Sequence, residues 1–339
     1  METKLLKANE ESIKLACALL KSGEVVAVPT ETVYGLAGDA TSSSAIKKIF
    51  EAKGRPADNP LIVHIGNIEM LDGIVSEFNN DAKKLADAFW PGPLTIIMPR
   101  GEKICKETSA GLDSVGVRMP SNEIARKIIN LSGVAFSAPS ANLSGKPSPT
   151  TAEDVFADMN GRIPLIIDGG ESDAGVESTV ISVLEDTLII LRPGIVTKEE
   201  IEKVLNKEVK VAKEVTEGVK ADSIVRSPGM KYKHYAPNAK VTIVKSTLEK
   251  FVEFVNLNKK ENTLVMCFEG EEKLMPVSAL SYGKKDDPKS QAHNLFAVLR
   301  ELDKNHAEQV FVRCPDTTGI SLAVYNRLIR SAGFNIIEF

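Results

Sequence analysis

Lys53 and Arg55 lie two positions apart in a short loop sequence (residues 53–60, KGRPADNP), between an apolar helical pattern and an apolar strand pattern. Two positive charges beside a glycine could neutralise the phosphates of a nucleotide. The prolines on either side of Asn59 stiffen the loop, which favours a preorganised site. The alternative is that both cations lie in solvent and offset the negative charge at the C-terminal end of the helix. The residue types alone are compatible with both interpretations.

A second group of polar side chains follows the next apolar run. Residues 137–148 (SAPSANLSGKPS) combine several serine hydroxyls with the amide of Asn142. Small side chains allow backbone N–H groups and hydroxyls to approach phosphate or ribose oxygens closely. The same residue types also form ordinary turns, so a loop without a function is equally compatible with this pattern.

Two arginines and a histidine stand on predicted strands. Arg118 and Arg192 each lie at a strand end, where a guanidinium could bind a carboxylate or a phosphate through two hydrogen bonds. A structural ion pair is the alternative for each arginine. The alternation of the strand at residues 61–65 places His64 on the same face as Ile62, where a buried and hydrogen-bonded histidine is the simplest interpretation.

The segment at residues 213–238 has no sustained periodicity and is locally basic. Arg226, Lys231, Lys233 and His234 have no acidic residue between them, and Tyr235 follows directly. Such a segment could fold over a bound anion as a lid. A solvated tether between two domains is the alternative.

Motifs of several common catalytic sites are missing. The sequence contains no HExxH, GxSxG or GxGxxG pattern, and its four histidines are scattered. The nearest approach to a P-loop, at residues 140–147, lacks the first glycine and has Pro147 where Ser or Thr would bind Mg²⁺. The chemistry should therefore depend on positioning and charge rather than on a catalytic metal or a triad.

The elements that must position these residues form two regions. In the first region, helices are predicted from Ser12 to Gly23 and from about Thr41 to Gly54. Short apolar runs bounded by glycine and proline predict strands at residues 24–28, 61–65, 94–98, 115–117, 134–136, 165–167, 180–183 and 188–191. This pattern is typical of a strand-rich α/β domain.

From Val241 onward, predicted strands and helices alternate. Strands are expected at residues 241–244, 263–268 and 309–312 and near Ile336, with helices around residues 247–255, 291–302 and 320–329. Such alternation predicts a parallel sheet covered by helices. We therefore expect a first domain at residues 1–207, a linker at 208–240 and a smaller domain at 241–339.

Composition limits the class of protein. The chain has 339 residues, which suits about two domains of roughly 100–200 residues each. A hydrophobic share of 43% with 26% charged residues is typical of a globular protein rather than of a disordered or membrane-spanning one. The net charge of -4 argues against a general basic coat for nucleic acids, so any anion site must be local.

The cysteines and the N-terminus bear on the cellular compartment. The four cysteines have no CxxC or zinc-ligand spacing, so reduced thiols are expected. The early acids Glu10 and Glu11 fit neither a signal peptide nor a transit peptide, and no run approaches the roughly 18 apolar residues that cross a bilayer. We expect a soluble, cytoplasmic protein without membrane partners.

Together, these signals occur in the order found in one family. The chain resembles the threonylcarbamoyl-AMP synthases, in the two-domain form that has a YrdC-like domain followed by a smaller C-terminal domain. The resemblance rests on motifs at residues 29–36 (PTETVYGL), 53–56 (KGRP), 59–64 (NPLIVH), 90–95 (WPGPLT), 115–120 (VGVRMP), 138–142 (APSAN), 177–179 (EST), 192–194 (RPG) and 227–237 (SPGMKYKHYAP). The C-terminal domain is matched only by its architecture.

The resemblance implies an α/β fold with a twisted mixed sheet and a concave cleft, followed by a Rossmann-like parallel domain. It implies a nucleotidyltransferase that condenses L-threonine, bicarbonate or CO₂, and ATP into threonylcarbamoyl-AMP and releases pyrophosphate. Mg²⁺ would arrive with ATP, and no metal site of the protein's own is implied. The product would pass to a downstream tRNA threonylcarbamoyl transferase, so tRNA would be at most an indirect partner.

The family's site residues carry over onto this sequence through the matching motifs. The resemblance implies a threonine pocket formed by Thr32, His64, Arg118, Ala138 and Ser178. It implies ATP contacts from Lys53, Arg55, Asn59, Ser114, Ser140, Asn142, Ser148, Arg192, His234 and Tyr235. Lys53 and Arg55 would be the catalytic cations, and the linker would close over the site while anchored to the C-terminal domain.

Two other functions fit parts of the sequence. A concave basic surface could bind RNA without catalysis, because a chain of net negative charge can still have a local basic patch. Related domains also take part in carbamoyl transfer during hydrogenase maturation. Those larger proteins carry cysteine-rich zinc modules, and this sequence has none.

Overall fold

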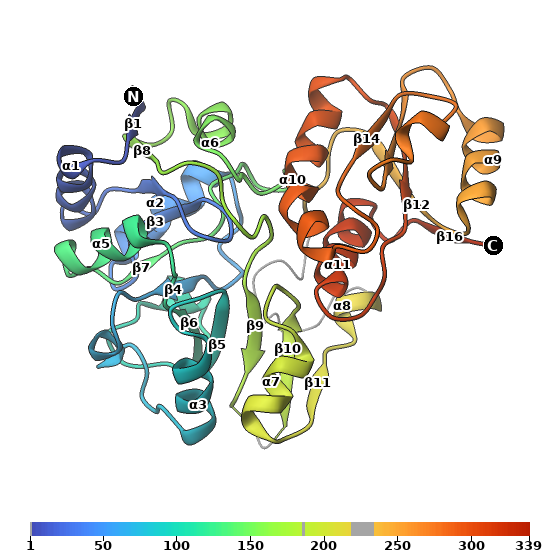
Figure 1. Cartoon of the computed structure of the whole chain (residues 1–339). Helices are drawn as coiled ribbons and strands as arrows, with labels where there is room; N and C mark the ends of the chain where they lie inside the picture. Colours follow the sequence, from blue (N-terminus) through green and yellow to red (C-terminus); the bar gives the residue numbers. More distant parts are fainter. Residues whose placement is uncertain (1, 185–186, 218–233) are drawn as a thin grey trace.

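Short β-branched runs and amphipathic stretches fold into two separate sheets, each covered by helices (Figure 1). The computed structural model describes residues 2–184, 187–217 and 234–339. The sheets belong to an N-terminal domain and a C-terminal domain that lie side by side. This arrangement confirms the predicted fold class.

The N-terminal sheet is mixed. Among the described residues its strand order is β1-β8-β2-β3-β7-β4-β6-β5-β9-β10-β11. The pairs β2–β8, β4–β6 and β5–β9 are parallel, whereas β2–β3, β4–β7 and β5–β6 are antiparallel. The strands are β1 (Lys4–Lys7), β2 (Val26–Val28), β3 (Gly35–Asp39), β4 (Ile62–His64), β5 (Leu94–Pro99), β6 (Ser114–Arg118), β7 (Phe136–Ser137), β8 (Leu165–Asp168), β9 (Thr179–Ser182), β10 (Leu188–Arg192) and β11 (Val209–Val211).

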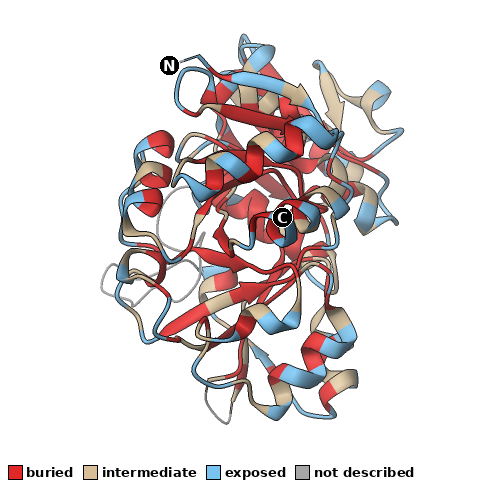
Figure 2. Cartoon of the chain, turned by 90° about the vertical axis from the view of Figure 1, so that its left-hand side faces the viewer, coloured by how far each residue is buried: buried red, intermediate tan, exposed pale blue. Residues whose placement is uncertain are grey.

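Helices with one apolar face cover this sheet. They are α1 (Glu10–Lys21), α2 (Ser43–Lys53), α3 (Asn80–Phe89), α4 (Lys106–Ser109), α5 (Glu123–Ser132), α6 (Ala152–Met159), α7 (Lys198–Leu205) and α8 (Glu214–Glu217), with a 3₁₀ turn at Ile68–Leu71. Figure 2 shows the inner strands of the sheet largely buried, while the helices turn exposed residues outward, and the edge strand β1 is mostly exposed. Burial on both faces explains why the strands are apolar runs rather than alternating sequences.

The end of α2 positions two of the predicted cations. Ser42 caps the helix by accepting a hydrogen bond from the N–H of Ala45. Gly54 ends it in the left-handed conformation, with a φ of 59°. Glycine adopts this conformation without a steric penalty because it has no Cβ. Lys53 therefore lies in the last helical turn, and Arg55 lies just beyond it.

Three strands of the N-terminal sheet, β1, β3 and β11, have no counterpart in the sequence-based prediction. Strand β3 has the sequence GLAGD, and it pairs between β2 and β7. Its two glycines conceal the apolar pattern, but packing requires one of them, because a Cβ on Gly38 would lie 3.1 Å from Cδ1 of Ile49. Tertiary packing therefore determines this strand.

The C-terminal sheet has the order β14-β13-β15-β12-β16, and the pairings among its described strands are all parallel. Its strands are β12 (Lys240–Lys245), β13 (Thr263–Cys267), β14 (Ala279–Ser281), β15 (Gln309–Arg313) and β16 (Ile336–Glu338). The helices are α9 (Leu248–Asn258), α10 (Pro288–Lys304) and α11 (Ser321–Ser331), with a 3₁₀ turn at Glu272–Leu274. The alternation from Val241 onward predicted this parallel sheet correctly.

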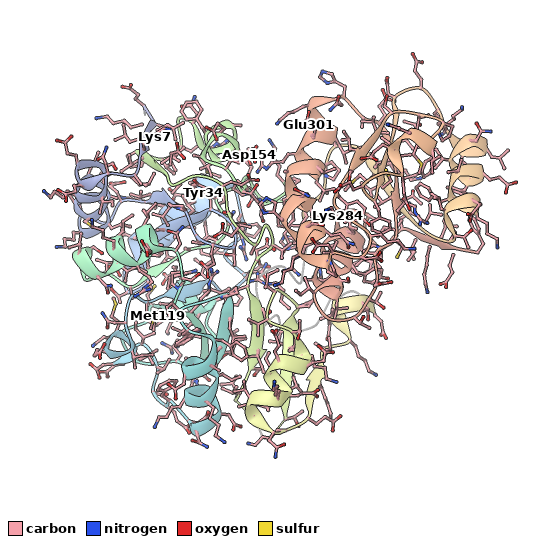
Figure 3. All side chains as sticks on the ribbon, in the orientation of Figure 1. Lys7, Tyr34, Met119, Asp154, Lys284 and Glu301 are labelled. Atoms are coloured by element: carbon pink, nitrogen blue, oxygen red, sulfur yellow. The ribbon has the colours of Figure 1, made fainter. Side chains whose placement is uncertain are left out.

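Helices α10 and α11 face the N-terminal domain (Figure 1). The guanidinium of Arg300 on α10 donates to the carbonyl oxygen of Pro147 at 2.6 Å and to Asp158 Oδ2 at 2.9 Å. Its Nε lies 3.8 Å from the carboxylate of Asp154, which Figure 3 shows on the side of the N-terminal domain nearest α10. The buried apolar cluster of the C-terminal domain also includes Val33 and Val176 of the N-terminal domain. The two domains therefore share both polar and apolar contacts.

No helix in the described part of the chain has the length and apolar character needed to span a bilayer.

The close contact between the domains predicts an unusual sensitivity at Gly175. A Cβ there would lie 2.3 Å from the carbonyl oxygen of His293 on α10, and Gly175 has a φ of +72°. Gly170 has a similar φ of +84° with nothing within 4 Å. Gly170→Ala should cost about 1–2 kcal/mol of backbone strain, and Gly175→Ala should cost clearly more because α10 must also move. Urea denaturation of both variants measures the difference, and equal losses of stability would contradict the contact.

Candidate active site

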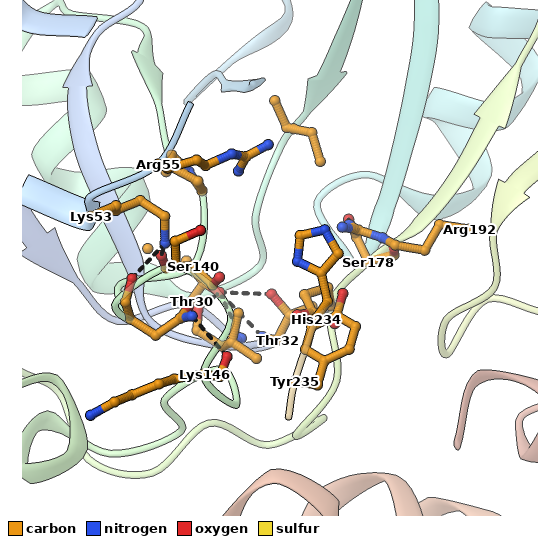
Figure 4. Close-up of a pocket in the computed structure, with 18 of the residues that line it drawn as sticks. Thr30, Thr32, Lys53, Arg55, Ser140, Lys146, Ser178, Arg192, His234 and Tyr235 are labelled. Atoms are coloured by element: carbon orange, nitrogen blue, oxygen red, sulfur yellow. Dashed lines mark hydrogen bonds between the residues drawn. The ribbon is translucent and has the colours of Figure 1, made fainter. Parts of the chain in front are cut away.

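A cavity opens where several strand ends of the N-terminal domain meet the first described residues after position 233. Its walls come from the β2–β3 loop, the end of α2, the ends of β4, β6 and β10, and the loops after β7 and before β9. Figure 4 shows Lys53 and Arg55 on one side of the pocket and Ser178, Arg192 and Tyr235 on the other.

Lys53 is buried beside the cavity rather than solvated. Its Nζ donates to the carbonyl oxygen of Ser140 and, at 2.7 Å, to that of Asn142. Burial and the neighbouring charge of Arg55 hold the pKa of the Lys53 ammonium well below its ordinary value. An arriving anion would favour the charged form again. Arg55 also lines the cavity, at intermediate exposure.

Arg118 lines the cavity and is also part of an ion pair within the protein. Its Nη2 lies 2.7 Å from Glu31 Oε1, and both side chains are buried. Its Nη1 donates to Thr32 Oγ1 at 2.9 Å. Burial alone would raise the pKa of the Glu31 carboxyl, but the charge and hydrogen bond of Arg118 lower it below its ordinary value. Arg118 therefore forms the structural ion pair that was one of the two alternatives, and it also lines the cavity.

His64 is a neutral, buried imidazole. Its Nδ1 lies 3.2 Å from the carbonyl oxygen of Ile62, and its ring stacks on Phe136 with centroids 5.8 Å apart. Because a carbonyl oxygen only accepts hydrogen bonds, Nδ1 carries the proton and Nε2 is left as an acceptor. Burial, reinforced by the charge of Arg118, lowers the pKa of His64 to about 3.

Arg192 and Ser178 form the opposite wall. Arg192 Nε donates to the carbonyl oxygen of Ser178 at 3.0 Å, and Nη2 donates to Ser178 Oγ at 3.1 Å. Burial is the main reason why the pKa of Arg192 is lowered to about 10, so the guanidinium stays charged at neutral pH. Ser178 Oγ also lies 2.8 Å from Thr95 Oγ1.

Glu177 is a cavity residue to which the sequence analysis assigned no role. Its Oε1 accepts a hydrogen bond from Ser148 Oγ at 2.5 Å, and its Oε2 accepts one from Arg327 Nε at 2.9 Å. Burial alone would raise the pKa of this carboxyl, but the charges of Arg327 and Arg192 lower it below its ordinary value. The signals in the sequence were the EST motif at residues 177–179 and an acid two positions before the apolar strand β9. The sequence analysis also assigned no role to Glu31, which pairs with Arg118.

The structure brings most of the predicted site residues together around this cavity. Twelve of them line it: Thr32, Lys53, Arg55, His64, Arg118, Ala138, Ser140, Asn142, Ser178, Arg192, His234 and Tyr235.

Three other predicted residues lie elsewhere. Asn59 is fully buried, and its amide atoms have no hydrogen-bond partner among the residues that the structure describes. Ser114 lies at the opposite end of β6 from Arg118, paired with Pro99. Ser148 lies behind the wall, bonded to Glu177.

The structure describes only part of the basic segment, so only some of the predictions for it can be compared with the structure. Arg226, Lys231 and Lys233 lie outside the described residues, whereas His234 and Tyr235 line the cavity. Tyr235 is buried against Phe296 of α10, with ring centroids 5.1 Å apart. Tyr235 therefore joins the cavity to the core of the C-terminal domain.

The charges around the cavity favour a ligand with several negative charges. Lys53, Arg55 and Arg192 converge on it, while its carboxylate Glu177 and the nearby Glu31 are each paired with an arginine. Within the described ranges, no three His, Cys, Asp or Glu side chains form a group that could hold a metal ion. The arrangement suits binding and alignment of phosphates and carboxylates.

Comparisons with known proteins cover nearly the whole chain. A family model of Sua5, YciO and YrdC proteins, described as Telomere recombination, matches residues 18–194. A second model, described as Threonylcarbamoyl-AMP synthase, C-terminal domain, matches residues 196–333.

Full-length relatives agree with these matches. A Pyrococcus abyssi protein named threonylcarbamoyl-AMP synthase is 43% identical, over 98% of this chain and 97% of its own. A Bacillus subtilis protein of the same name is 42% identical, over 98% of this chain and 96% of its own. The crystal structure of P. abyssi Sua5 complexed with L-threonine has a TM-score of 0.91 at 41% identity, covering 100% of this chain and 99% of that one.

The neutral state of His64 predicts a specific pH dependence of stability. The pKa is about 3 in the folded protein and about 6.5 in the unfolded chain. Between these values the unfolded chain binds more protons, so this residue's contribution to stability falls as the pH falls from about 6.5, by up to about 1.4 kcal/mol per pH unit. The stability difference between wild type and His64→Asn should therefore shrink from pH 7 to pH 4.

Denaturation at several pH values measures this difference. His306→Asn, at an exposed position, is the matched control and should show a much weaker dependence. A His64→Asn difference that stays constant with pH would show that folding does not lower the pKa of His64.

Proposed function

The chain belongs to the threonylcarbamoyl-AMP synthase family, as its motifs predicted, and from this premise we propose that it condenses L-threonine, bicarbonate or CO₂, and ATP into threonylcarbamoyl-AMP. Pyrophosphate is the second product, which makes the enzyme a nucleotidyltransferase. The adenylate would serve threonylcarbamoyladenosine formation in tRNA through a downstream transferase, with the cytoplasm as the place of action. The observation that carries the proposal is the convergence of Lys53, Arg55 and Arg192 on one cavity.

Threonine would bind between Arg118, His64 and Thr32. Arg118 supplies the positive charge for the threonine carboxylate, and its ion pair with Glu31 holds the guanidinium in place. The neutral His64 offers Nε2 as an acceptor for the threonine hydroxyl or amine. The L-threonine complex of the P. abyssi relative supports a threonine pocket in this fold.

The reaction needs alignment and neutralisation of charge. The threonine amine attacks the carbon of CO₂ and loses a proton, which gives a carbamate. A carbamate oxygen then attacks the α-phosphorus of ATP. The bond between this phosphorus and the oxygen that bridges to the β-phosphate breaks, and pyrophosphate leaves. Lys53 and Arg55 would stabilise the phosphates of Mg-ATP, because fixed cations in a cavity with little water act strongly on developing charge.

The test of this proposal is detection of threonylcarbamoyl-AMP by mass spectrometry after incubation with Mg-ATP, bicarbonate and threonine. Pyrophosphate release should require both threonine and bicarbonate. An RNA-binding protein without catalysis would instead show salt-sensitive tRNA affinity and no adenylate. The cavity favours catalysis over that alternative, since its cations line a pocket rather than an open basic surface.

Lys53→Ala should reduce turnover about 100-fold or more while leaving the fold intact, because the variant loses a buried cation beside the phosphates. Steady-state pyrophosphate release measures the effect. Lys47→Ala is the matched control on the same helix, since Lys47 is exposed. Near-normal turnover of Lys53→Ala would refute the role of Lys53.

The site should discriminate against valine more strongly than against serine. Serine lacks only a methyl group, which is worth about 1–3 kcal/mol in a close-fitting apolar pocket. Valine leaves the hydroxyl partners of threonine unpaired, and buried polar groups without partners cost more. Values of kcat/KM for the three amino acids measure both penalties, and similar values for serine and valine would contradict a paired hydroxyl.

A further inference from the structure

Arg327 extends from helix α11 of the C-terminal domain into the wall of the N-terminal cavity. It is fully buried. Its Nε donates to Glu177 Oε2 at 2.9 Å, and its Nη1 donates to the carbonyl oxygen of Pro193 at 2.8 Å and to Asn326 Oδ1 at 2.9 Å. Its Nη2 donates to the carbonyl oxygen of Glu177 at 3.3 Å. One guanidinium thus holds two loops of the other domain.

The loop with Pro193 carries Arg192, which is expected to contact ATP, and the loop with Glu177 carries Ser178, which is expected to contact threonine. Glu177 accepts the hydroxyl of Ser148, and Pro193 directly follows Arg192. The guanidinium of Arg327 also lies 5.9 Å from the ring centroid of Tyr235. Ser148, Arg192 and Tyr235 were all expected to contact ATP. Each of them therefore contacts Arg327 or lies next to a group that Arg327 binds.

The charges at this contact make the two domains dependent on each other. A buried carboxylate or guanidinium without its partner is costly, because neither is hydrated there. Among the described residues, Arg327 is the one close ion-pair partner of the Glu177 carboxylate, at a distance of 2.9 Å. The cavity wall around Glu177 is therefore complete only when α11 is docked.

A second arginine of the C-terminal domain holds the same region from the other side. Arg300 donates to the carbonyl oxygen of Pro147, the residue before Ser148, and to the carboxylate of Asp158. The loop that carries Ser148 is thus held by α10 through its backbone and by α11 through Glu177. Attachment at two points limits how far the loop can shift.

We propose that Arg327 is a positioning residue for the N-terminal active site, and that it sets the ATP side of the cavity through Glu177 and the carbonyl of Pro193. The inference rests on the proposed function and extends it, because it gives the C-terminal domain a part in the reaction. Arg327 itself touches no substrate. Its effect should appear in the use of ATP and, through Ser178 beside Glu177, in the use of threonine as well.

The test compares Arg327→Lys with Arg313→Lys in the full-length chain. Lysine keeps the positive charge, but it lacks the planar fork whose three nitrogens bind the side chain and backbone of Glu177 and the carbonyl of Pro193 at once. Arg313 is the matched control: it is buried in the same domain and paired through two nitrogens with Glu271, and it lies away from the cavity. Both changes weaken a buried arginine–glutamate pair, but only one pair reaches the active site.

Pyrophosphate release and direct ATP binding by calorimetry are the two measurements. Arg327→Lys should raise the KM and the Kd for ATP at least tenfold, and it should also raise the KM for threonine. Arg313→Lys should leave all three within twofold. The proposal is refuted if folded Arg327→Lys retains the wild-type Kd for ATP, or if both variants weaken ATP binding equally.

Failure of the proposed function would look different. Wild-type protein would then release no pyrophosphate with threonine and bicarbonate, whereas the calorimetric comparison would still report on Arg327.

A second variant covers the case in which Arg327→Lys does not fold. Glu177→Gln combined with Arg327→Met leaves no buried charge without a partner at this contact. We expect this double variant to fold and to bind ATP at least tenfold more weakly than wild type, because the attachment to α11 is still missing. A folded double variant with the wild-type Kd for ATP would overturn the proposal.

Discussion

The structure depends on the pairing of charges that are buried around one cavity. Glu31 with Arg118 and Glu177 with Arg327 are both removed from water, and either partner alone would be strongly destabilising. Each pair therefore holds its segments in one arrangement. Because Arg118 and Arg327 neutralise these two carboxylates, the cations Lys53, Arg55 and Arg192 are available to an anionic ligand. The mildly acidic net charge of the chain thus conceals a positively charged site.

The mixed sheet explains why these groups can meet. His64 and Arg118 end the neighbouring parallel strands β4 and β6, and Arg192 ends β10 further along the sheet. Because parallel strands end on the same edge, residues far apart in sequence reach a common opening. The antiparallel strand β7 passes between β3 and β4, and the polar loop that follows it leads to this opening. The same edge supplies both the cations and the small polar groups.

Local patterns predicted the elements better than the partners of the site residues. The end of α2 could be predicted because Gly54 follows the last apolar turn, and this placed Lys53 and Arg55 at a helix end. The burial of Lys53 could not, since it depends on carbonyl oxygens nearly ninety positions away. The partner of Glu177 lies 150 positions away in another domain, where no spacing rule applies. Strand β3 was missed because tertiary packing, rather than an apolar pattern, determines it.

The apolar contacts between the domains have a consequence for cooperativity. Val33 and Val176 of the N-terminal domain lie in the same buried cluster as Tyr235, Phe296 and the other core residues of the C-terminal domain. Opening either domain therefore exposes apolar surface that belongs to the other, so the free energy of one depends on the other being folded. The two sheets are separate in architecture, but this shared cluster couples their stabilities.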